Sequence, residues 1–256
     1  MDAFVKTLLI VCPLVFLAGF VDSVAGGGGI ISLPAYLMAG IPAHLAAGTN
    51  KVVNGTGAMI SSFKYLKNGS VRLRPTLIAA LCALLGSALG TKLATLIPES
   101  TLKAMMLIAL PCVAVFLVIK KDFGDDSRPK PVISPLREAV SAALIGLVFG
   151  CYDGLLGPGT GTFMLIGFTA FLSMDLLSAA GCARVSNLAS NIASAAVWIL
   201  HGQVYWRLAL PALLCSILGN YLGVRFAIRG GSKKIRLMMF VVLGLLFAKM
   251  LYDLLA

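Results

Sequence analysis

The chain has 256 residues, of which 59% are hydrophobic and only 12% are charged, and its mean hydropathy is +0.96. A soluble domain carries about 25% charged residues, so the composition excludes a soluble enzyme and predicts an integral membrane protein. The net charge of +11 does not indicate a nucleic-acid partner, because basic residues in a membrane chain gather in the short loops on its cytoplasmic side. The expected partner is the lipid bilayer.

Apolar runs follow one another along the whole length, and long runs of this kind are typical of membrane-spanning helices. We therefore predict an all-α, polytopic transmembrane helix bundle. The second run in each half is short for a full span, so broken or short helices are expected there, and whether they are re-entrant stays open. The ten predicted segments are 4–20, 29–39, 45–66, 73–97, 102–120, 137–152, 160–174, 177–200, 206–227 and 234–254.

The two halves carry the same polar motifs. The sequence DSVAGGGG from Asp22 to Gly29 returns as DGLLGPGTG from Asp153 to Gly161. The sequence AAGTNKVVN, which ends at Asn54, returns as AAGCARVSN, which ends at Asn187. An internal duplication with a polar motif in each copy is the architecture of many secondary transporters. We divide the chain into a first transmembrane repeat (1–120), a linker (121–136) and a second transmembrane repeat (137–256).

Basic residues change sides between equivalent loops. The loop at 64–74 holds four basic residues and its counterpart at 201–207 holds one, whereas the loop at 225–236 holds five and its counterpart at 92–103 holds two. Positive residues favour the cytoplasmic side, so the two repeats are predicted to be inverted, as an odd number of segments in each repeat requires. The linker then lies in the cytoplasm and both termini lie outside.

Four charged residues are left at membrane depth, and they form two repeat-related pairs: Asp22 with Asp153, and Lys51 with Arg184. A charge at the centre of a bilayer costs at least ~2.5–3.5 kcal/mol, so such a residue usually faces a cavity or a partner. The two cations are accompanied on their helices by amide side chains, which are those of Asn50, Asn54, Asn187 and Asn191. A cation with amide donors suits an anion stripped of water, and this predicts a central anion site. The alternative is that the cations neutralise the aspartates or, for Arg184, extend toward the membrane interface.

Glycine motifs precede the short second segment of each half. They contain Gly26, Gly27, Gly28 and Gly29 in the first copy and Gly157, Gly159, Thr160 and Gly161 in the second. Glycine lets the backbone approach a ligand closely, and the free N–H groups at the start of the next helix favour an anion. The alternative is that these glycines only permit tight packing and a hinge. By contrast, the GxxxG patterns at Gly86 and Gly219 predict close helix packing.

Asp22 and Asp153 stand directly before the glycine motifs. They could brace the unwound backbone, or take up a proton in step with anion movement, and the sequence supports both interpretations. The six cysteines and two histidines have no metal-binding spacing, and no Ser–His, Cys–His or HExxH arrangement is present. We expect no cofactor, no metal and no enzymatic activity.

With these residues the chain resembles the sulfite exporter TauE/SafE family. The resemblance rests on Asp22 to Gly29, on Thr49-Asn50-Lys51, and on Asp153 to Gly161 with Asn187 to Asn191. It implies a secondary transporter of the bacterial inner membrane that exports sulfur-containing anions such as sulfite, sulfoacetate or other organosulfonates. The cation differs between the copies, as Lys51 and Arg184, so a site shared by both would be chemically asymmetric.

We therefore expect a transporter that works by alternating access around a central anion site. An anion channel, or a transporter of a different small organic anion, is the alternative. The sequence leaves open the coupling ion and whether the chain forms a homo-oligomer.

Overall fold

The computed structural model describes the backbone of residues 3–119 and 133–255 and the side chains of residues 4–109 and 133–241. Within these residues every regular element is a helix, which confirms the predicted fold class. Most of the expected linker 121–136 lies outside the described residues. The helix that follows it begins at Pro135, where the Ser134 hydroxyl accepts a hydrogen bond from the N–H of Arg137.

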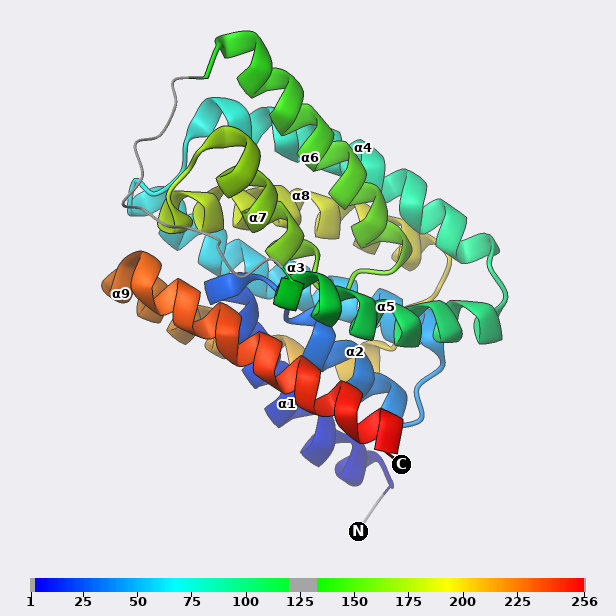
Figure 1. Cartoon of the computed structure of the whole chain (residues 1–256). Helices are drawn as coiled ribbons and strands as arrows, with labels where there is room; N and C mark the ends of the chain where they lie inside the picture. Colours follow the sequence, from blue (N-terminus) through cyan, green and yellow to red (C-terminus); the bar gives the residue numbers. More distant parts are fainter. Residues whose placement is uncertain (1–2, 120–132, 256) are drawn as a thin grey trace.

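The described helices follow the predicted segments in order (Figure 1). Helix α9 is two helices joined at a kink, because Gly231 has a non-helical backbone with φ 58° and ψ −158°. Each half therefore contributes five helical segments to the described chain. The bounds are α1 Ala3–Ala25, α2 Gly29–Met38, α3 Ala43–Lys67, α4 Leu73–Leu96, α5 Glu99–Ile119, α6 Pro135–Leu155, α7 Thr160–Leu172, α8 Leu176–Leu200 and α9 Trp206–Leu255.

Four of the described helices are long and apolar enough to cross a membrane, namely α1, α4, α6 and the first part of α9. Their outer faces carry leucines spaced four residues apart, which are Leu77, Leu81, Leu85 and Leu89 on α4 and Leu210, Leu214, Leu218 and Leu222 on α9. The α9 leucines stand 133 positions after those of α4. Exposed apolar stripes of this kind fit the hydrocarbon of a bilayer, so the chain is a membrane protein.

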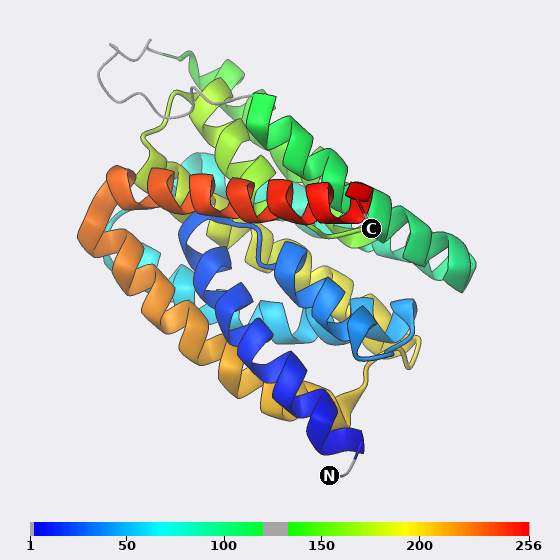
Figure 2. The same cartoon turned by 60° about the horizontal axis from the view of Figure 1, so that its bottom comes forward.

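The helices form two outer pairs around a central pair (Figures 1 and 2). Helix α4 packs on α6 and α1 packs on α9, while α3 and α8 contact each other between them. Glycines bring the outer pairs together: Gly90 lies against the backbone of Cys151, and Gly223 lies against the backbone of Phe20. The predicted packing role of the GxxxG patterns is confirmed.

The duplication is also visible in the contacts between the halves. The Thr49 hydroxyl accepts a hydrogen bond from the N–H of Tyr205 at 2.9 Å, and at the equivalent position the Cys182 sulfur accepts one from the N–H of Arg72 at 3.4 Å. Because each contact joins one repeat to the other, the two halves are packed reciprocally.

Helices α3 and α8 run antiparallel where they touch. Gly48 lies against Trp198 near one end, and Ser61 bonds to Arg184 toward the other. Antiparallel packing of equivalent helices is what inverted repeats require. The orientation of the two repeats in a membrane stays a prediction.

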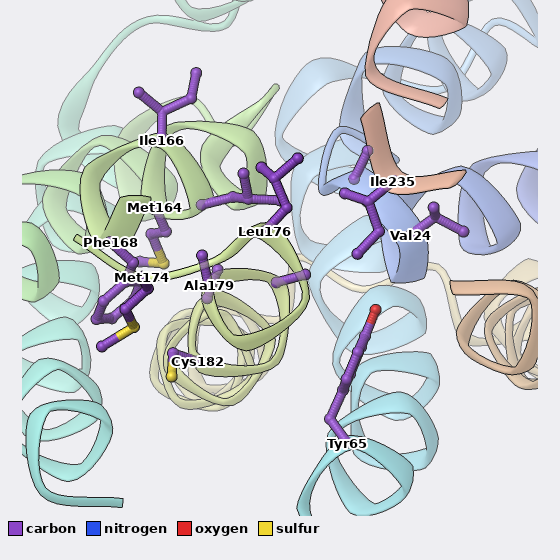
Figure 3. Close-up of a cluster of buried hydrophobic side chains, with 14 of the residues drawn as sticks. Val24, Tyr65, Met164, Ile166, Phe168, Met174, Leu176, Ala179, Cys182 and Ile235 are labelled. Carbon is purple, nitrogen blue, oxygen red and sulfur yellow. The ribbon is translucent and has the colours of Figure 1, made fainter. Parts of the chain in front are cut away.

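A buried apolar cluster holds α7 against α8 (Figure 3). It contains Met164 and Phe168 of α7, Met174 of the connection, and Leu176 of α8, each at most 1% exposed. Val24 and Tyr65 extend the same cluster toward α1 and α3. This packing fixes the start of α7, and with it the second glycine motif, relative to the central helices.

Candidate functional site

The two glycine motifs cross each other in the interior, between the end of α1 and the end of α6. The hydroxyl of Thr162, the residue after the second motif, donates to the carbonyl of Ala25 at 3.1 Å and also to that of Gly26. Gly26 is so close to Gly161 that a side chain on it would overlap the Gly161 backbone. A short helix comes after each motif, as expected: α2 has 10 residues and α7 has 13.

Both motifs use a backbone that favours glycine. Gly26 has φ 71°, Gly157 has φ 92° and Gly159, which precedes α7, has φ 77°. L-residues rarely adopt these angles. The turns let each chain segment reverse within the interior, and in the first motif the N–H groups of Gly27 and Gly28 point to the Asp22 carboxylate.

A buried polar cavity lies between these turns and the helices α3 and α8. The space that the centre of a water molecule can reach measures about 10 Å³, which is room for about one water molecule. Most of the residues predicted for the anion site meet here. The lining consists of Asp22, Gly27, Gly29, Asn50, Lys51, Asn54, Asp153, Gly157, Gly159, Thr160, Gly161, Asn187 and Asn191.

Lys51 brings a positive charge to this cavity and is paired with a carboxylate from the other repeat. Its ammonium nitrogen is 2.7 Å from Asp153 Oδ2, and both residues are at most 4% exposed. Ser190 of α8 donates a second hydrogen bond to the same oxygen at 2.6 Å. Gly157 leaves space for the lysine, because a Cβ on it would lie 3.3 Å from Lys51 Nζ.

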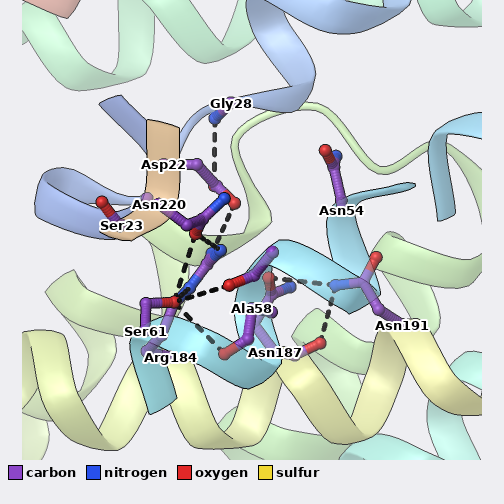
Figure 4. A network of polar contacts seen from close by, with 12 residues as sticks. Asp22, Ser23, Gly28, Asn54, Ala58, Ser61, Arg184, Asn187, Asn191 and Asn220 are labelled. Atoms are coloured by element: carbon purple, nitrogen blue, oxygen red, sulfur yellow. Dashed lines mark hydrogen bonds and ion pairs between the residues drawn. The ribbon is translucent and has the colours of Figure 1, made fainter. Parts of the chain in front are cut away.

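Arg184 lies outside the lining of this cavity. Its Nη1 pairs with Asp22 Oδ2, its Nε donates to the Ser61 hydroxyl at 2.7 Å, and its Nη2 donates to Asn220 Oδ1 at 2.6 Å (Figure 4). It borders instead a second small cavity between Gly26 and Asn187. In this conformation the two cations therefore do not face one common space.

Asp22 is held from both sides. Its Oδ1 accepts hydrogen bonds from the N–H groups of Gly27 at 3.1 Å and Gly28 at 3.0 Å, while Arg184 engages Oδ2. The carboxylate thus takes the place that an anion would occupy at the start of α2. The bracing role considered for Asp22 is present in this arrangement.

The amide side chains line the cavity in two linked pairs. Asn50 Oδ1 accepts hydrogen bonds from Ser32 at 2.7 Å and from Asn54 at 3.1 Å. On the opposite helix Asn191 donates to the carbonyl of Asn187 at 2.7 Å and to its side-chain oxygen at 3.1 Å. Asn50 Nδ2, on a residue only 3% exposed, donates to no group in the described part of the chain. Asn50 also belongs to the lining of the cavity.

Sequence reasoning missed Ser61, Ser190 and Asn220, which complete the two ion-pair networks. Asn220 lies inside a GxxxG pattern, which was interpreted only as a packing motif. A signal was nevertheless present, because an asparagine among apolar residues at membrane depth needs a polar partner.

Comparison with known proteins places these features in a family. The family model described as sulfite exporter TauE/SafE matches residues 11–250. The chain is 35% identical to a "Probable membrane transporter protein" of Haemophilus influenzae, over 99% of this chain and 98% of that protein. It is 36% identical to "Probable membrane transporter protein ORF9" of a Sinorhizobium species, over 93% and 90%. It is 29% identical to "Probable membrane transporter protein YfcA" of Escherichia coli K12, over 97% and 94%.

No solved structure matches the chain. The family match covers nearly the whole length, and the relatives are named as membrane transporters rather than enzymes. The chain belongs to the sulfite exporter TauE/SafE family of membrane transporters.

Proposed function

We propose that the protein is a secondary transporter that exports small sulfur-containing anions, such as sulfite, sulfoacetate or other organosulfonates, by alternating access. The observation that carries this proposal is the convergence of Lys51, the amide side chains and the second glycine motif on one buried cavity between the repeats. The family match supports transport, and the chemistry of the cavity supports an anion as its substrate.

The cavity offers three kinds of anion contact. Lys51 supplies a positive charge, the Asn50 amide supplies a donor with no acceptor among the described residues, and the start of α7, at Thr160 and Gly161, supplies the positive end of a helix dipole. Gly157 and Gly159 lack side chains, so a ligand could approach the backbone there closely. A sulfonate or sulfite oxygen could accept hydrogen bonds from the first two and be attracted by the third.

The small size of the cavity supports alternating access rather than an open channel. With room for about one water molecule, the site accepts an organosulfonate only after the surrounding helices separate. Reciprocal packing of the two repeats provides a way to do so, because one repeat can rock against the other. An anion channel would instead conduct without saturation.

In this proposal the protein lies in the bacterial inner membrane, with the linker 121–136 in the cytoplasm and both termini outside. The basic residues of the loops at 64–74 and 225–236 support this orientation. The proposed partners are the anion and the lipid bilayer.

The test is thermal unfolding of the purified protein with sulfite, sulfoacetate, taurine, thiosulfate, sulfate and chloride at matched ionic strength. An anion at about 100 times its Kd stabilises a reversible folded state by ~2.7 kcal/mol. We expect selective stabilisation by sulfite or a sulfonate, its loss in Lys51→Met, and its retention in Lys67→Met, which changes an exposed lysine on the same helix. Equal shifts in both variants would contradict the proposed site. If carboxylates of the same size, added to the same series, stabilise the protein more strongly, the substrate would belong to another class of organic anion.

A further inference from the structure

We propose that Asp153, and not Asp22, carries a proton together with the transported anion, so that one proton enters the site with each monovalent anion. This inference rests on the proposed anion transport and adds its coupling. The two aspartates occupy equivalent places in the repeats, and their surroundings separate their roles.

Asp22 is fully engaged. Two backbone N–H groups bond to Oδ1, and the Arg184 guanidinium bonds to Oδ2. Arg184 is itself held by Ser61 and Asn220. Protonation of Asp22 would leave a buried guanidinium without its counter-charge, which is strongly unfavourable. Asp22 is therefore kept as the counter-charge of Arg184.

Asp153 is engaged on one side only. Lys51 and Ser190 both contact Oδ2, while Oδ1 accepts no hydrogen bond from the described residues and the residue lines the cavity. The sequence explains this difference, because Pro158 stands where the first repeat has Gly27. Proline has no N–H, so the second motif cannot repeat the backbone clamp that holds Asp22.

The charges of the site also call for a proton. Asp22 and Asp153 balance Arg184 and Lys51, so the site is neutral before an anion enters. An added anion leaves one uncompensated negative charge in a medium of low dielectric constant, which is costly. A proton taken from the aqueous phase by Asp153 restores neutrality and releases the Lys51 ammonium to the anion. Both leave together when the site opens to the other side.

Few other charged groups lie around Asp153. Lys51 approaches from α3, with Asp22 of α1 beyond it, and α8 contributes Ser190 and the paired Arg184. Helix α7 contains no charged residue, and the basic residues of α4, Arg74 and Lys92, are exposed. Proton uptake on anion binding is therefore assigned to Asp153.

The test measures proton uptake on binding of isethionate, an organosulfonate whose single charge is constant between about pH 6 and 8 because the sulfonate is a strong acid and the hydroxyl a very weak one. Isothermal titration calorimetry of the purified protein in buffers of different ionisation enthalpy gives the number of protons bound per anion. We expect about one proton for the wild type, with affinity falling about tenfold per pH unit as the pH rises. We expect no proton uptake and a flat pH profile for Asp153→Asn, which still binds.

Two outcomes separate this inference from the proposed function. Isethionate binding to the wild type without proton uptake would overturn the coupling and leave the anion site standing. No binding at any pH would contradict the proposed organosulfonate site itself and remove the basis for coupling. The wild-type proton count does not depend on the stability of the variant.

Discussion

The two repeats place an aspartate, a glycine turn and a cation at equivalent positions, yet the two copies are built differently. In one, Asp22 and Arg184 form a closed network with Ser61, Asn220 and two backbone N–H groups. In the other, Lys51 and Ser190 both contact the same carboxylate oxygen of Asp153, and Asp153 and Lys51 line the cavity. In the proposed function, one copy of the duplicated motif acts as a brace and the other binds the anion.

The choice of cation fits this division. The guanidinium of Arg184 presents several N–H groups in a fixed plane, and each of its three nitrogens reaches a different partner. Lys51 is a single point charge on a flexible chain, so it can exchange the carboxylate of Asp153 for another anion with little rearrangement. The asymmetry that the sequence shows at these positions therefore has a structural meaning.

The largest expected contrast is in stability, between Asp22→Asn and Asp153→Asn. The first leaves Arg184 buried without a counter-charge, which should cost about 3–5 kcal/mol of unfolding free energy. The second leaves Lys51 beside a polar cavity that water can enter, so the loss should be about 1–3 kcal/mol. Denaturant unfolding in mixed detergent micelles measures both. A larger loss for Asp153→Asn would reverse the assignment of brace and binding copy.

Alanine substitutions in the two glycine turns should show the same contrast, with the larger loss of unfolding free energy in the first motif. Gly26→Ala combines a strained φ with overlap on the backbone of Gly161, whereas a Cβ on Gly157 meets the movable end of Lys51. Gly69→Ala is the matched control, because Gly69 has the same φ of 71° and a Cβ added there would have nothing within 4 Å. We expect it to lower the free energy of unfolding by ~1–2 kcal/mol. We expect Gly26→Ala to cost clearly more than this control. Gly157→Ala should stay near the control in stability and lower anion affinity, and the opposite order would contradict the comparison.

The smallest expected effect is a difference between Ser190→Ala and Ser61→Ala in the pH profile of anion affinity. Ser190→Ala removes the hydroxyl that donates a hydrogen bond to the Asp153 carboxylate, so the pH profile of anion affinity should move to higher pH. Ser61→Ala removes a hydrogen bond to Arg184 and should leave the pH profile unchanged. Isethionate titrations across pH compare the two, and equal shifts would show that both ion pairs titrate with the anion.

Much of this architecture could be predicted from the sequence. The helical segments, the short helices after Gly29 and Thr160, and the close packing at Gly90 and Gly223 follow from apolar run lengths and from glycine placement. The meeting of the two glycine motifs with Lys51 at one cavity follows from the paired intramembrane charges. Each of these features depends on local patterns or on the repeat.

The remaining features depend on contacts between distant residues. The sequence did not show which aspartate pairs with which cation, since Asp22 and Arg184 are 162 positions apart. Nor did it show that Arg184 would be turned away from the central cavity, because that follows from Asn220 on α9. The different partners of the two aspartates appear only when the helices are packed together.

The central claim is tested most directly by transport of a labelled organosulfonate in proteoliposomes, compared between the wild type, Lys51→Met and Lys67→Met. The account predicts saturable transport by the wild type and by Lys67→Met, and its loss in a folded Lys51→Met, because only Lys51 brings a positive charge to the cavity in the described residues. Transport at the wild-type rate by Lys51→Met would contradict the account and return Lys51 to the role of a counter-charge for Asp153.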